Sequence, residues 1–257
     1  MITKSIILNT DSYKLSMFQQ NPKGTEYVYS YIESRGGKWD KTVFFGLQAF
    51  LREYLTKQIT KKDIDFAKQF AKLHGEPFNE EGWNYILSEH AGYLPLKVMA
   101  VPEGTVLSTK NILLSIVNTD PKCAWLTTPI ETPLLRSIWY PTTVATNSHA
   151  CKQIILKYLK ESGTPDSIDF KLHDFSARGV SSFETATLGG MSHLVNFKGT
   201  DTISGVLGAM EYYDAEVCGF SIPAMEHSTV TAWGRKNEAE AYKNMLSVYA
   251  KPGSVVA

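Results

Sequence analysis

The sequence predicts an α/β protein in two parts: an α+β N-terminal domain with a helical connection over residues 1–163, then the first part of an irregular α/β barrel over residues 164–257. Stretches of period-two spacing in the first part predict antiparallel strands. In the second part, three apolar runs each end in a polar cluster and are followed by helical spacing, which predicts βα units and a parallel sheet. Ligands of such sheets bind at the carboxyl ends of the strands, where these clusters fall.

Local patterns mark the elements of the first domain. The predicted strands are residues 26–35, 94–100 and 112–117. Helical spacing is found over residues 44–55. Thr60, with Asp63 three residues later, predicts the start of a helix that stops at Gly75, and Asn79 predicts the cap of a further helix.

A long helical segment is expected from Asp120, an N-cap followed by Pro121, to Glu161. Prolines 129, 133 and 141 are the expected points of interruption. The sequence SGTPD at residues 162–166 marks the predicted domain boundary. In the second part, the predicted strands are residues 168–172, 194–197 and 217–222.

The last residues predict a helix over 237–249 and the beginning of a further strand over 254–257. A βα array that stops within a strand would leave an open sheet edge and an incomplete barrel. We therefore expect either a fragment or a chain that another polypeptide completes.

Composition excludes several classes of protein. Acidic and basic residues number 26 each, so the formal net charge is zero, whereas nucleic-acid and membrane-surface binders favour a basic surplus. No stretch approaches the roughly 18 apolar residues of a spanning helix, and residues 1–8 hold too short an apolar run for a signal peptide. Three scattered cysteines without a CxxC pair indicate a reducing cytoplasm. Because no HExxH pattern or Cys/His cluster is present, no metal ligands and no structural zinc are expected.

The polar clusters after the strands supply candidate site residues. Arg178 suits a phosphate or diphosphate, because its planar guanidinium binds oxyanions through two N–H groups, although a surface arginine is the alternative. The Asp201 carboxylate could accept from an amide or a ribose hydroxyl, or cap the helix that starts near Thr202. Phe175 could offer a stacking surface or fill the core.

Glu226 and His227 follow the third predicted strand. Histidine is well suited to exchange a proton or accept a phosphoryl group near neutral pH, and a neighbouring carboxylate often orients it; a structural histidine is the alternative. His173 is a weaker candidate, and His193 is expected in the core. Lys198 stands close to Asp201. These patterns predict an anionic ligand with a planar ring, but no particular reaction.

Long segments, in order along the whole chain, resemble the N-terminal half of the nicotinamide phosphoribosyltransferase family, dimeric enzymes of the type II phosphoribosyltransferases. The matching segments are TDSYKLSMFQQ, YVYSYIESR, TVFFGLQ, FNEEGWNYIL, AVPEG, NTDP, WYPTTVATNS, KLHDFSARGVSS, HLVNFKGTDT and FSIPAMEHSTVTAWG. The resemblance implies that nicotinamide and phosphoribosyl pyrophosphate give nicotinamide mononucleotide and pyrophosphate. It also implies Mg²⁺ on the diphosphate, and ATP hydrolysis through a phosphorylated histidine as a coupling reaction.

By motif position, the resemblance gives roles to the candidates. On the nicotinamide it puts Phe175, Asp201 and Ser221, together with Tyr13 and Asp11 from the other subunit of a homodimer. Arg178 resembles an arginine that serves both the base site and the phosphates, and Arg35 resembles a pyrophosphate contact across the dimer. Lys198 is also expected to bind substrate. His227 resembles the phosphorylated histidine, with Glu226 beside it.

Two departures from the family pattern affect these expectations. Ser176-Ala177 stands where the family usually has Gly-Tyr, which would alter the wall of the base pocket. The later aspartates, an RPDSG-like segment and a glycine-rich phosphate loop are missing, so the chain alone is expected to be weakly active or inactive. The alternatives are a non-catalytic or split-enzyme fragment that binds nicotinamide or pairs with a partner chain, and a nicotinate phosphoribosyltransferase. Asp201 argues against the latter, because it would repel a carboxylate substrate.

Overall fold

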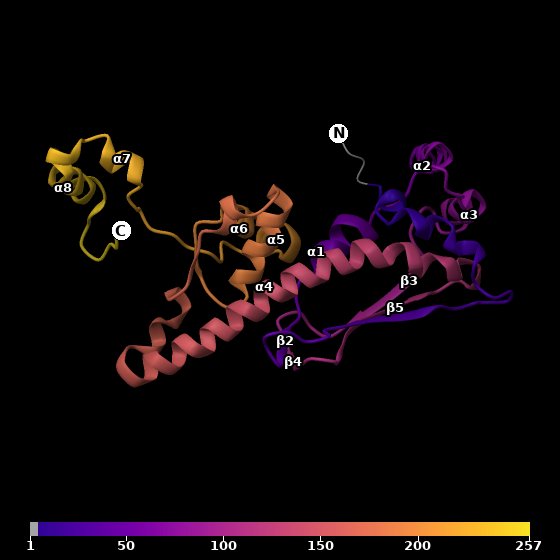
Figure 1. Cartoon of the computed structure of the whole chain (residues 1–257), viewed down its shortest axis with the longest axis horizontal. Coiled ribbons are helices and arrows are strands. Elements are labelled where there is room, and N and C mark those ends of the chain that lie inside the picture. The colour runs from indigo at the N-terminus through magenta and orange to yellow at the C-terminus, as the bar shows by residue number, and fades with distance from the viewer. Residues whose placement is uncertain (1–4) are drawn as a thin grey trace.

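The computed structural model describes residues 5–257, and its longest element is α4 (Thr127–Ser162), which runs diagonally through the molecule (Figure 1). This helix continues past all of its prolines, so the expected interruptions are wrong. Gly46 packs closely against the turn of α4 that contains Pro141. A Cβ atom on Gly46 would lie 2.6 Å from the carbonyl oxygen of Ser137. The Ser137 carbonyl has no helical hydrogen-bond donor, because the residue four positions later is Pro141, which has no backbone N–H. A glycine there lets the neighbouring segment lie against the altered turn.

The three predicted strands of the first part are confirmed as one antiparallel sheet with the order β1-β5-β3. Its strands are β1 (Tyr29–Glu33), β3 (Leu96–Ala100) and β5 (Ile112–Asn118). Ser115 in the central strand is opposite Tyr31 on one side and Met99 on the other. The sequence missed a second antiparallel pair, β2 (Lys41–Val43) with β4 (Val106–Ser108), because strands of three residues are too short to display a period.

The predicted helix starts of the first part are confirmed. The helices are α1 (Leu47–Phe50), which continues into a π-helical turn (Leu51–Leu55), α2 (Lys61–His74) and α3 (Glu80–Glu89). Thr60 accepts from the backbone N–H of Asp63, whose carboxylate accepts from the Thr60 N–H, so the capping box is complete. Asn79 caps α3 by accepting from the Gly82 N–H at 3.0 Å. Short 3-10 turns occupy Ile6–Leu8, Ser12–Leu15, Met17–Gln19 and Pro121–Leu126.

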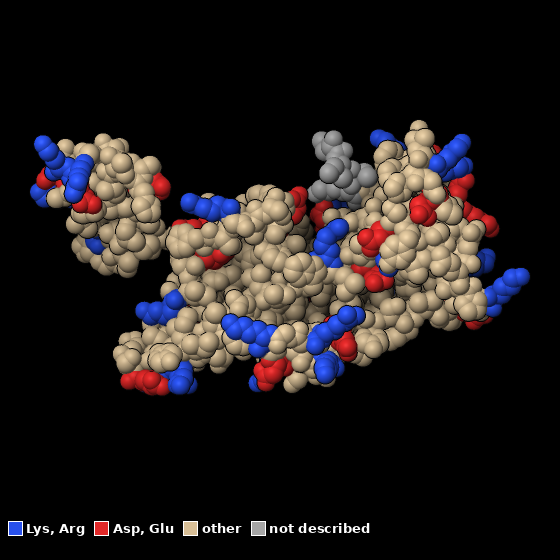
Figure 2. Space-filling model, viewed as in Figure 1, with Lys and Arg blue, Asp and Glu red and all other residues tan. Residues whose placement is uncertain are grey.

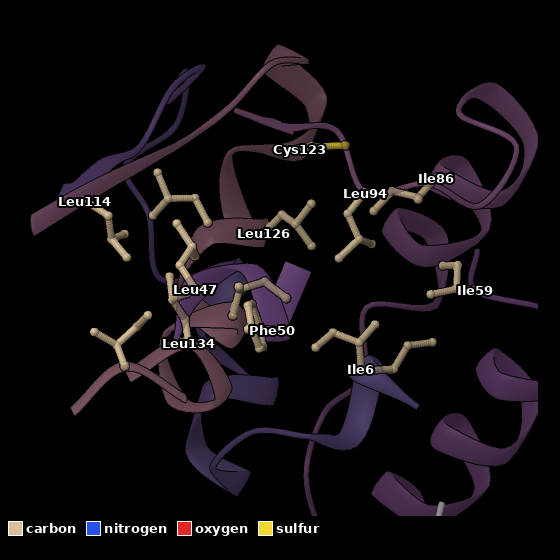
Figure 3. Packing of buried hydrophobic residues seen from close by; sticks show 14 of the residues in the cluster. Ile6, Leu47, Phe50, Ile59, Ile86, Leu94, Leu114, Cys123, Leu126 and Leu134 are labelled. Carbon is tan, nitrogen blue, oxygen red and sulfur yellow. The ribbon is translucent and has the colours of Figure 1, made fainter. Parts of the chain in front are cut away.

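Two hydrophobic clusters meet on α4. The larger lies between the antiparallel sheet, α1, α2, α3 and the first half of α4; Figure 3 shows side chains such as Phe50, Leu114 and Leu134 pointing toward one another in it. Each fully buried side chain of this size contributes about 1.5–3 kcal/mol through its removal from water. The smaller cluster joins the two parts of the chain and contains Val43, Phe45, Ala49, Ala145, Met191 and Ala209. One continuous helix therefore carries both clusters.

A parallel sheet is present in the second part, as predicted. Its first two strands lie later in the chain than expected, whereas its third segment, at Phe220, falls within the predicted run at residues 217–222. The first two strands are β6 (His173–Asp174) and β7 (Gly199–Thr200), and Phe220 joins Gly199 by an isolated parallel bridge. Residues 168–172 fall largely in a 3-10 turn (Pro165–Phe170), and Leu194 still belongs to a helix. The first two apolar runs were misassigned as strands because β6 and β7 are only two residues long and include Asp174 and Gly199, residue types that are depleted in strands.

The helices of the second part are α5 (Phe183–Leu194) and α6 (Ile203–Tyr213). Gly190 and Gly205 lie where these helices touch: a Cβ on Gly190 would be 2.8 Å from the Gly205 Cα. Gly190 is therefore a close-packing position, where a side chain would not fit without a shift of the neighbouring helix. This contact holds the loops that precede both helices close together.

The last part of the chain forms a small unit of α7 (His227–Thr231) and α8 (Glu238–Tyr249), which an extended segment connects to the rest (Figure 1). The predicted helix near residues 237–249 is confirmed as α8. The predicted strand at 254–257 is wrong; instead, Ala257 exchanges two backbone hydrogen bonds with Pro223 and Met225. This pairing closes the unit on itself.

Charges of both signs are interspersed over the face seen in Figure 2, in keeping with the balanced composition. Among the described helices, none combines the length and apolar character needed to cross a bilayer. The short run at residues 1–8 considered for a signal peptide begins in residues 1–4, which lie outside the described residues. The predicted boundary at residues 163/164 directly follows the end of α4 and stays a prediction.

We predict that Gly190→Ala destabilises the fold by about 1–3 kcal/mol, because the new methyl group would overpack the α5–α6 contact. Helix propensity acts in the opposite direction, favouring Ala by about 1 kcal/mol, so a loss of stability isolates the steric effect. Urea unfolding followed by circular dichroism measures it. Gly37→Ala is the control, since no atom lies within 4 Å of its added Cβ. Equal stability of both variants and the wild type would contradict the close packing.

Candidate functional site

Three neighbouring backbone segments end at the same edge of the small parallel sheet. The Asp201 N–H donates to the Asp174 carbonyl at 2.8 Å, and the Thr200 N–H donates to the Phe220 carbonyl at 2.9 Å. The residues that follow β6, β7 and the Phe220 bridge are Phe175, Asp201 and Ser221. We call this group, together with His173, the strand-end site. The expectation that polar clusters would meet at the carboxyl ends of parallel strands is therefore met for these residues.

The Asp201 carboxylate is the centre of the strand-end site. Its Oδ1 accepts a hydrogen bond from the Ser221 hydroxyl and lies 3.2 Å from His173 Nε2, within hydrogen-bond reach. The hydrogen bond from Ser221, followed by that from His173, holds the pKa of Asp201 below the ordinary carboxyl value despite some burial. Thr202, not Asp201, is the N-cap residue of α6, so the capping interpretation is wrong. Asp201 is thus an ionised acceptor at the sheet edge.

Phe175 presents an exposed aromatic ring beside this carboxylate. The side chain is 61% exposed, so the core interpretation is wrong. Its ring centroid lies 4.6 Å from that of His173, with the planes inclined by 36°. Gly199 makes room for the imidazole, since a Cβ on Gly199 would lie 2.8 Å from His173 Nδ1. An exposed ring next to a hydrogen-bond acceptor can bind a planar ligand that carries N–H groups.

His173 is the residue that sequence reasoning underestimated. It contacts both Phe175 and Asp201, and its position one strand away from Asp201 could have been found only from the pairing of β6 with β7. His193, by contrast, is buried as predicted: its Nε2 lies 3.0 Å from the Gly199 carbonyl oxygen, and burial lowers its pKa. The two histidines therefore flank β7 in different roles.

Arg178 lies in the 3-10 turn Ser176–Gly179, between β6 and α5. The Ser182 hydroxyl caps α5 by accepting from the Thr185 N–H at 3.1 Å. A hollow of about 380 Å³ lies beside this turn. Its walls come from the start of α5 and the start of α6, and they include Val180, Ser181, Ser182, Phe183, Asp201, Ile203 and Ser204. The hollow adjoins Asp201, so the strand-end site is concave on that side.

Lys198 is engaged elsewhere. Its Nζ lies 3.0 Å from Asp169 Oδ2, and Lys152 contacts the other oxygen of the same carboxylate at 3.1 Å. The hydrogen bond from Lys198, then that from Lys152, lowers the pKa of Asp169. The Lys198 ammonium thus serves an ion-pair network in this structure.

Glu226 and His227 lie at the start of α7, in the small C-terminal unit. The Glu226 carboxylate caps the helix by accepting from the backbone N–H and the hydroxyl of Ser228, which lowers its pKa. Among the described contacts, none is a hydrogen bond between Glu226 and His227. Electrostatic attraction to His227, and then to Arg178, also contributes to the lowered pKa of Glu226. Glu226 therefore orients the helix end and not the imidazole.

Asp11, Tyr13 and Arg35 belong to the first part of the chain. Asp11 accepts from the Thr132 hydroxyl, Tyr13 is 59% exposed, and Arg35 is exposed beyond β1. Within residues 5–257, none of the three forms a hydrogen bond, ion pair or ring contact with the strand-end site. A single chain does not bring these residues to Asp201.

Comparison with known proteins identifies the class. Two solved structures share the fold: a human nicotinic acid phosphoribosyltransferase (TM-score 0.60, 22% identity, covering 87% of this chain and 40% of that one) and a nicotinate-nucleotide pyrophosphorylase from Pyrococcus furiosus (TM-score 0.60, 16% identity, 100% and 51%). Residues 5–98 match the family described as nicotinamide phosphoribosyltransferase, N-terminal domain, and residues 170–251 match the nicotinate phosphoribosyltransferase family. The fold is that of the phosphoribosyltransferases.

Curated relatives narrow the class. The nicotinamide phosphoribosyltransferase of Xanthomonas campestris pv. campestris is 52% identical over 98% of this chain, and that of Acinetobacter baylyi is 33% identical over 92%. The chain spans 54% and 50% of their lengths, which is about half. Over the half of their lengths that it spans, the chain is similar to these nicotinamide phosphoribosyltransferases, and residues 5–98 match the N-terminal domain of that family.

We predict that Ser221→Ala raises the pKa of Asp201, because the lost hydrogen bond is the largest cause of its lowering. Carbon-13 NMR titration of the Asp201 carboxyl measures the shift. The stability that this bond contributes is present above the ordinary carboxyl pKa of about 3.9 and is lost as pH falls through the lower native value. The stability difference between wild type and variant should therefore disappear in acid.

Ser247→Ala is the matched control, since that hydroxyl donates only to a backbone carbonyl of α8. An Asp201 titration that is unchanged in Ser221→Ala would contradict the hydrogen-bonding scheme of the strand-end site.

Proposed function

We propose that the protein represented by this chain is a nicotinamide phosphoribosyltransferase, which forms nicotinamide mononucleotide and pyrophosphate from nicotinamide and phosphoribosyl pyrophosphate in NAD biosynthesis. The relatives at 52% and 33% identity carry this name, and the chain spans about half of each. The single observation that carries the proposal is the pairing of an exposed Phe175 ring with an ionised Asp201 carboxylate at one sheet edge. A pyridine carboxamide has the flat ring and the N–H donors that these two groups complement.

Recognition of the amide rests on charge. Asp201 Oδ1 already accepts from Ser221, so the remaining lone pairs of the carboxylate are available to the carboxamide N–H groups. A nicotinate ligand would present a second carboxylate to Asp201, and two like charges at contact distance repel. These considerations favour nicotinamide over the alternative substrate, nicotinate.

The other substrate requires cations. Displacement at the anomeric carbon passes through a positively charged sugar while a diphosphate leaves, so positive side chains near the leaving group lower the barrier. Arg178 is exposed in the turn Ser176–Gly179, beside the hollow that adjoins Asp201, which supports its assignment to the phosphate side. Tyr13, Asp11 and Arg35 have no contact with Asp201 inside one chain, which is compatible with the proposal that a second subunit of a homodimer supplies them.

Magnesium and ATP belong to the proposal as well. Among the described residues, no group of three potential metal ligands includes a residue of the strand-end site, and we therefore assign Mg²⁺ to the substrate. Mg²⁺ would be held mainly by the substrate's diphosphate, as is usual for this ion. His227 is exposed at the first position of α7 and is the residue proposed to accept a phosphoryl group from ATP. We place the reaction in the cytoplasm, where the three free cysteines would stay reduced.

The direct test of the activity measures intact mass and product in one sample from the native source. Nicotinamide mononucleotide formed from nicotinamide and phosphoribosyl pyrophosphate supports the proposal, and stimulation by ATP supports the role of His227. A mass near 28.7 kDa without product would favour the binding or split-enzyme alternative, which a complementary C-terminal fragment then tests by rescue.

We predict that Asp201→Asn abolishes most of the preference for nicotinamide over nicotinate, because the amide replaces a charged acceptor with a neutral donor and acceptor of the same shape. The measurement is the ratio of kcat/KM for the two substrates in the source enzyme. The ratio should fall at least tenfold, which corresponds to about 1.4 kcal/mol. Asp169→Asn is the control, since that carboxylate serves the lysine network. An unchanged ratio in Asp201→Asn would remove Asp201 from substrate selection.

A further inference from the structure

A second cluster of reactive side chains lies beside the end of α3, away from α5 and α6 (Figure 1). His90, Asp120 and Cys123 each offer one ligand atom, and these nitrogen, oxygen and sulfur atoms all lie within 4.8 Å of one another. Among the described residues, this is the one group of three potential metal ligands. The expectation that no such cluster exists came from spacing along the sequence and did not foresee this contact in space.

Local backbone structure holds the three residues together. His90 follows the last residue of α3, and Asp120 is the N-cap of the turn Pro121–Leu126, in which Cys123 lies. The Cys123 N–H donates to the Asp120 carbonyl at 2.9 Å. Cys123 is fully buried, whereas the side chains of His90 and Asp120 are 28% and 17% exposed. The cluster is thus pre-formed on its inner side and open to solvent on its outer side.

The Asp120 carboxylate is fixed by its surroundings. Its Oδ1 accepts from the Lys122 N–H at 2.9 Å, and its Oδ2 lies 2.8 Å from both His90 Nε2 and the Tyr85 hydroxyl. These hydrogen bonds lower the pKa of Asp120, which is therefore ionised at neutral pH. Tyr85, whose pKa is raised to about 12, stays a neutral donor to it. An outer donor that orients a ligating carboxylate is a regular feature of metal sites.

We propose that His90, Asp120 and Cys123 bind a divalent ion of the zinc class, with a water molecule in the fourth position. Imidazole nitrogen, thiolate sulfur and carboxylate oxygen are the ligands that Zn²⁺ takes in tetrahedral sites. The proximity of His90 and Asp120 is explained by their hydrogen bond and would not by itself indicate a metal site. The buried thiol of Cys123, within 4.8 Å of both other ligand atoms, is what makes the set suitable for a borderline-soft metal.

Binding of the divalent ion can be written with balanced charges and protons. The ion takes the place of the proton shared by His90 and Asp120, and the neutral imidazole then carries its N–H on Nδ1. The Cys123 thiol loses one proton to solvent and forms the sulfur–metal bond, so the two positive charges of the ion meet two negative ligands. The nearby Lys122 ammonium lies over the Tyr85 ring, 4.8 Å from its centroid.

The test is a titration of the chelator-treated chain with Co²⁺, a spectroscopic substitute for Zn²⁺. We expect one equivalent to bind, with a sulfur-to-cobalt charge-transfer band and tetrahedral d–d bands that excess Zn²⁺ abolishes. Cys123→Ser should remove the charge-transfer band, whereas the matched Cys151→Ser should keep it. Tyr85→Phe, which retains all three ligands, should weaken binding about tenfold.

Two further variants guard against misfolding of the Cys123 variant. Asp120→Asn retains an N-cap side chain and His90→Gln retains a polar partner, so circular dichroism should stay native while Co²⁺ binding is lost. No sulfur band with the folded wild-type chain, or a band that survives in folded Cys123→Ser, would overturn the proposal. The result is independent of nicotinamide mononucleotide formation, because no residue of the strand-end site takes part.

Discussion

The continuity of α4 is the constraint on which the rest of the structure depends. Leu134 in its first half belongs to the larger hydrophobic cluster, and Ala145 in its second half belongs to the smaller one. A break between these residues would weaken the connection between the antiparallel sheet and the pair α5 and α6, which also contact α1 and its neighbours through the smaller cluster. Gly46 protects this region, because it has no side chain to collide with the turn at Pro141. The strand-end site therefore stands on a scaffold that the first part of the chain fixes through packing.

A few hydrogen bonds determine the arrangement and the charge of the strand-end site. The strands β6 and β7 are two residues long, and the pair contributes little stability of its own. The close approach of α5 and α6 brings the strand ends together, and the hydroxyl of Ser221 and the imidazole of His173 keep Asp201 ionised. The exposed Phe175 ring then gives a hydrophobic surface beside a fixed negative charge. Both features suit a neutral planar amide better than an acid.

The sequence predicted elements whose structure depends on interactions within one turn of the chain. It did not predict elements whose structure depends on contacts between distant residues. The capped starts of α2 and α3 were predictable because Thr60, Asp63 and Asn79 satisfy backbone groups within one turn. The strands β6 and β7 were misplaced because pairing, and not propensity, makes His173 and Gly199 extended. The same limit hid the roles of His173 in the strand-end site and of His90 in the proposed metal site.

The most direct test of the central claim is the position of bound nicotinamide, measured as intermolecular nuclear Overhauser effects between its ring protons and the isotope-labelled chain. Binding at the strand-end site predicts contacts with the Phe175 and His173 rings, and loss of those contacts in Phe175→Leu with the fold intact. Contacts confined to other aromatic residues, with Phe175 unaffected, would contradict the assignment of this sheet edge as the nicotinamide site.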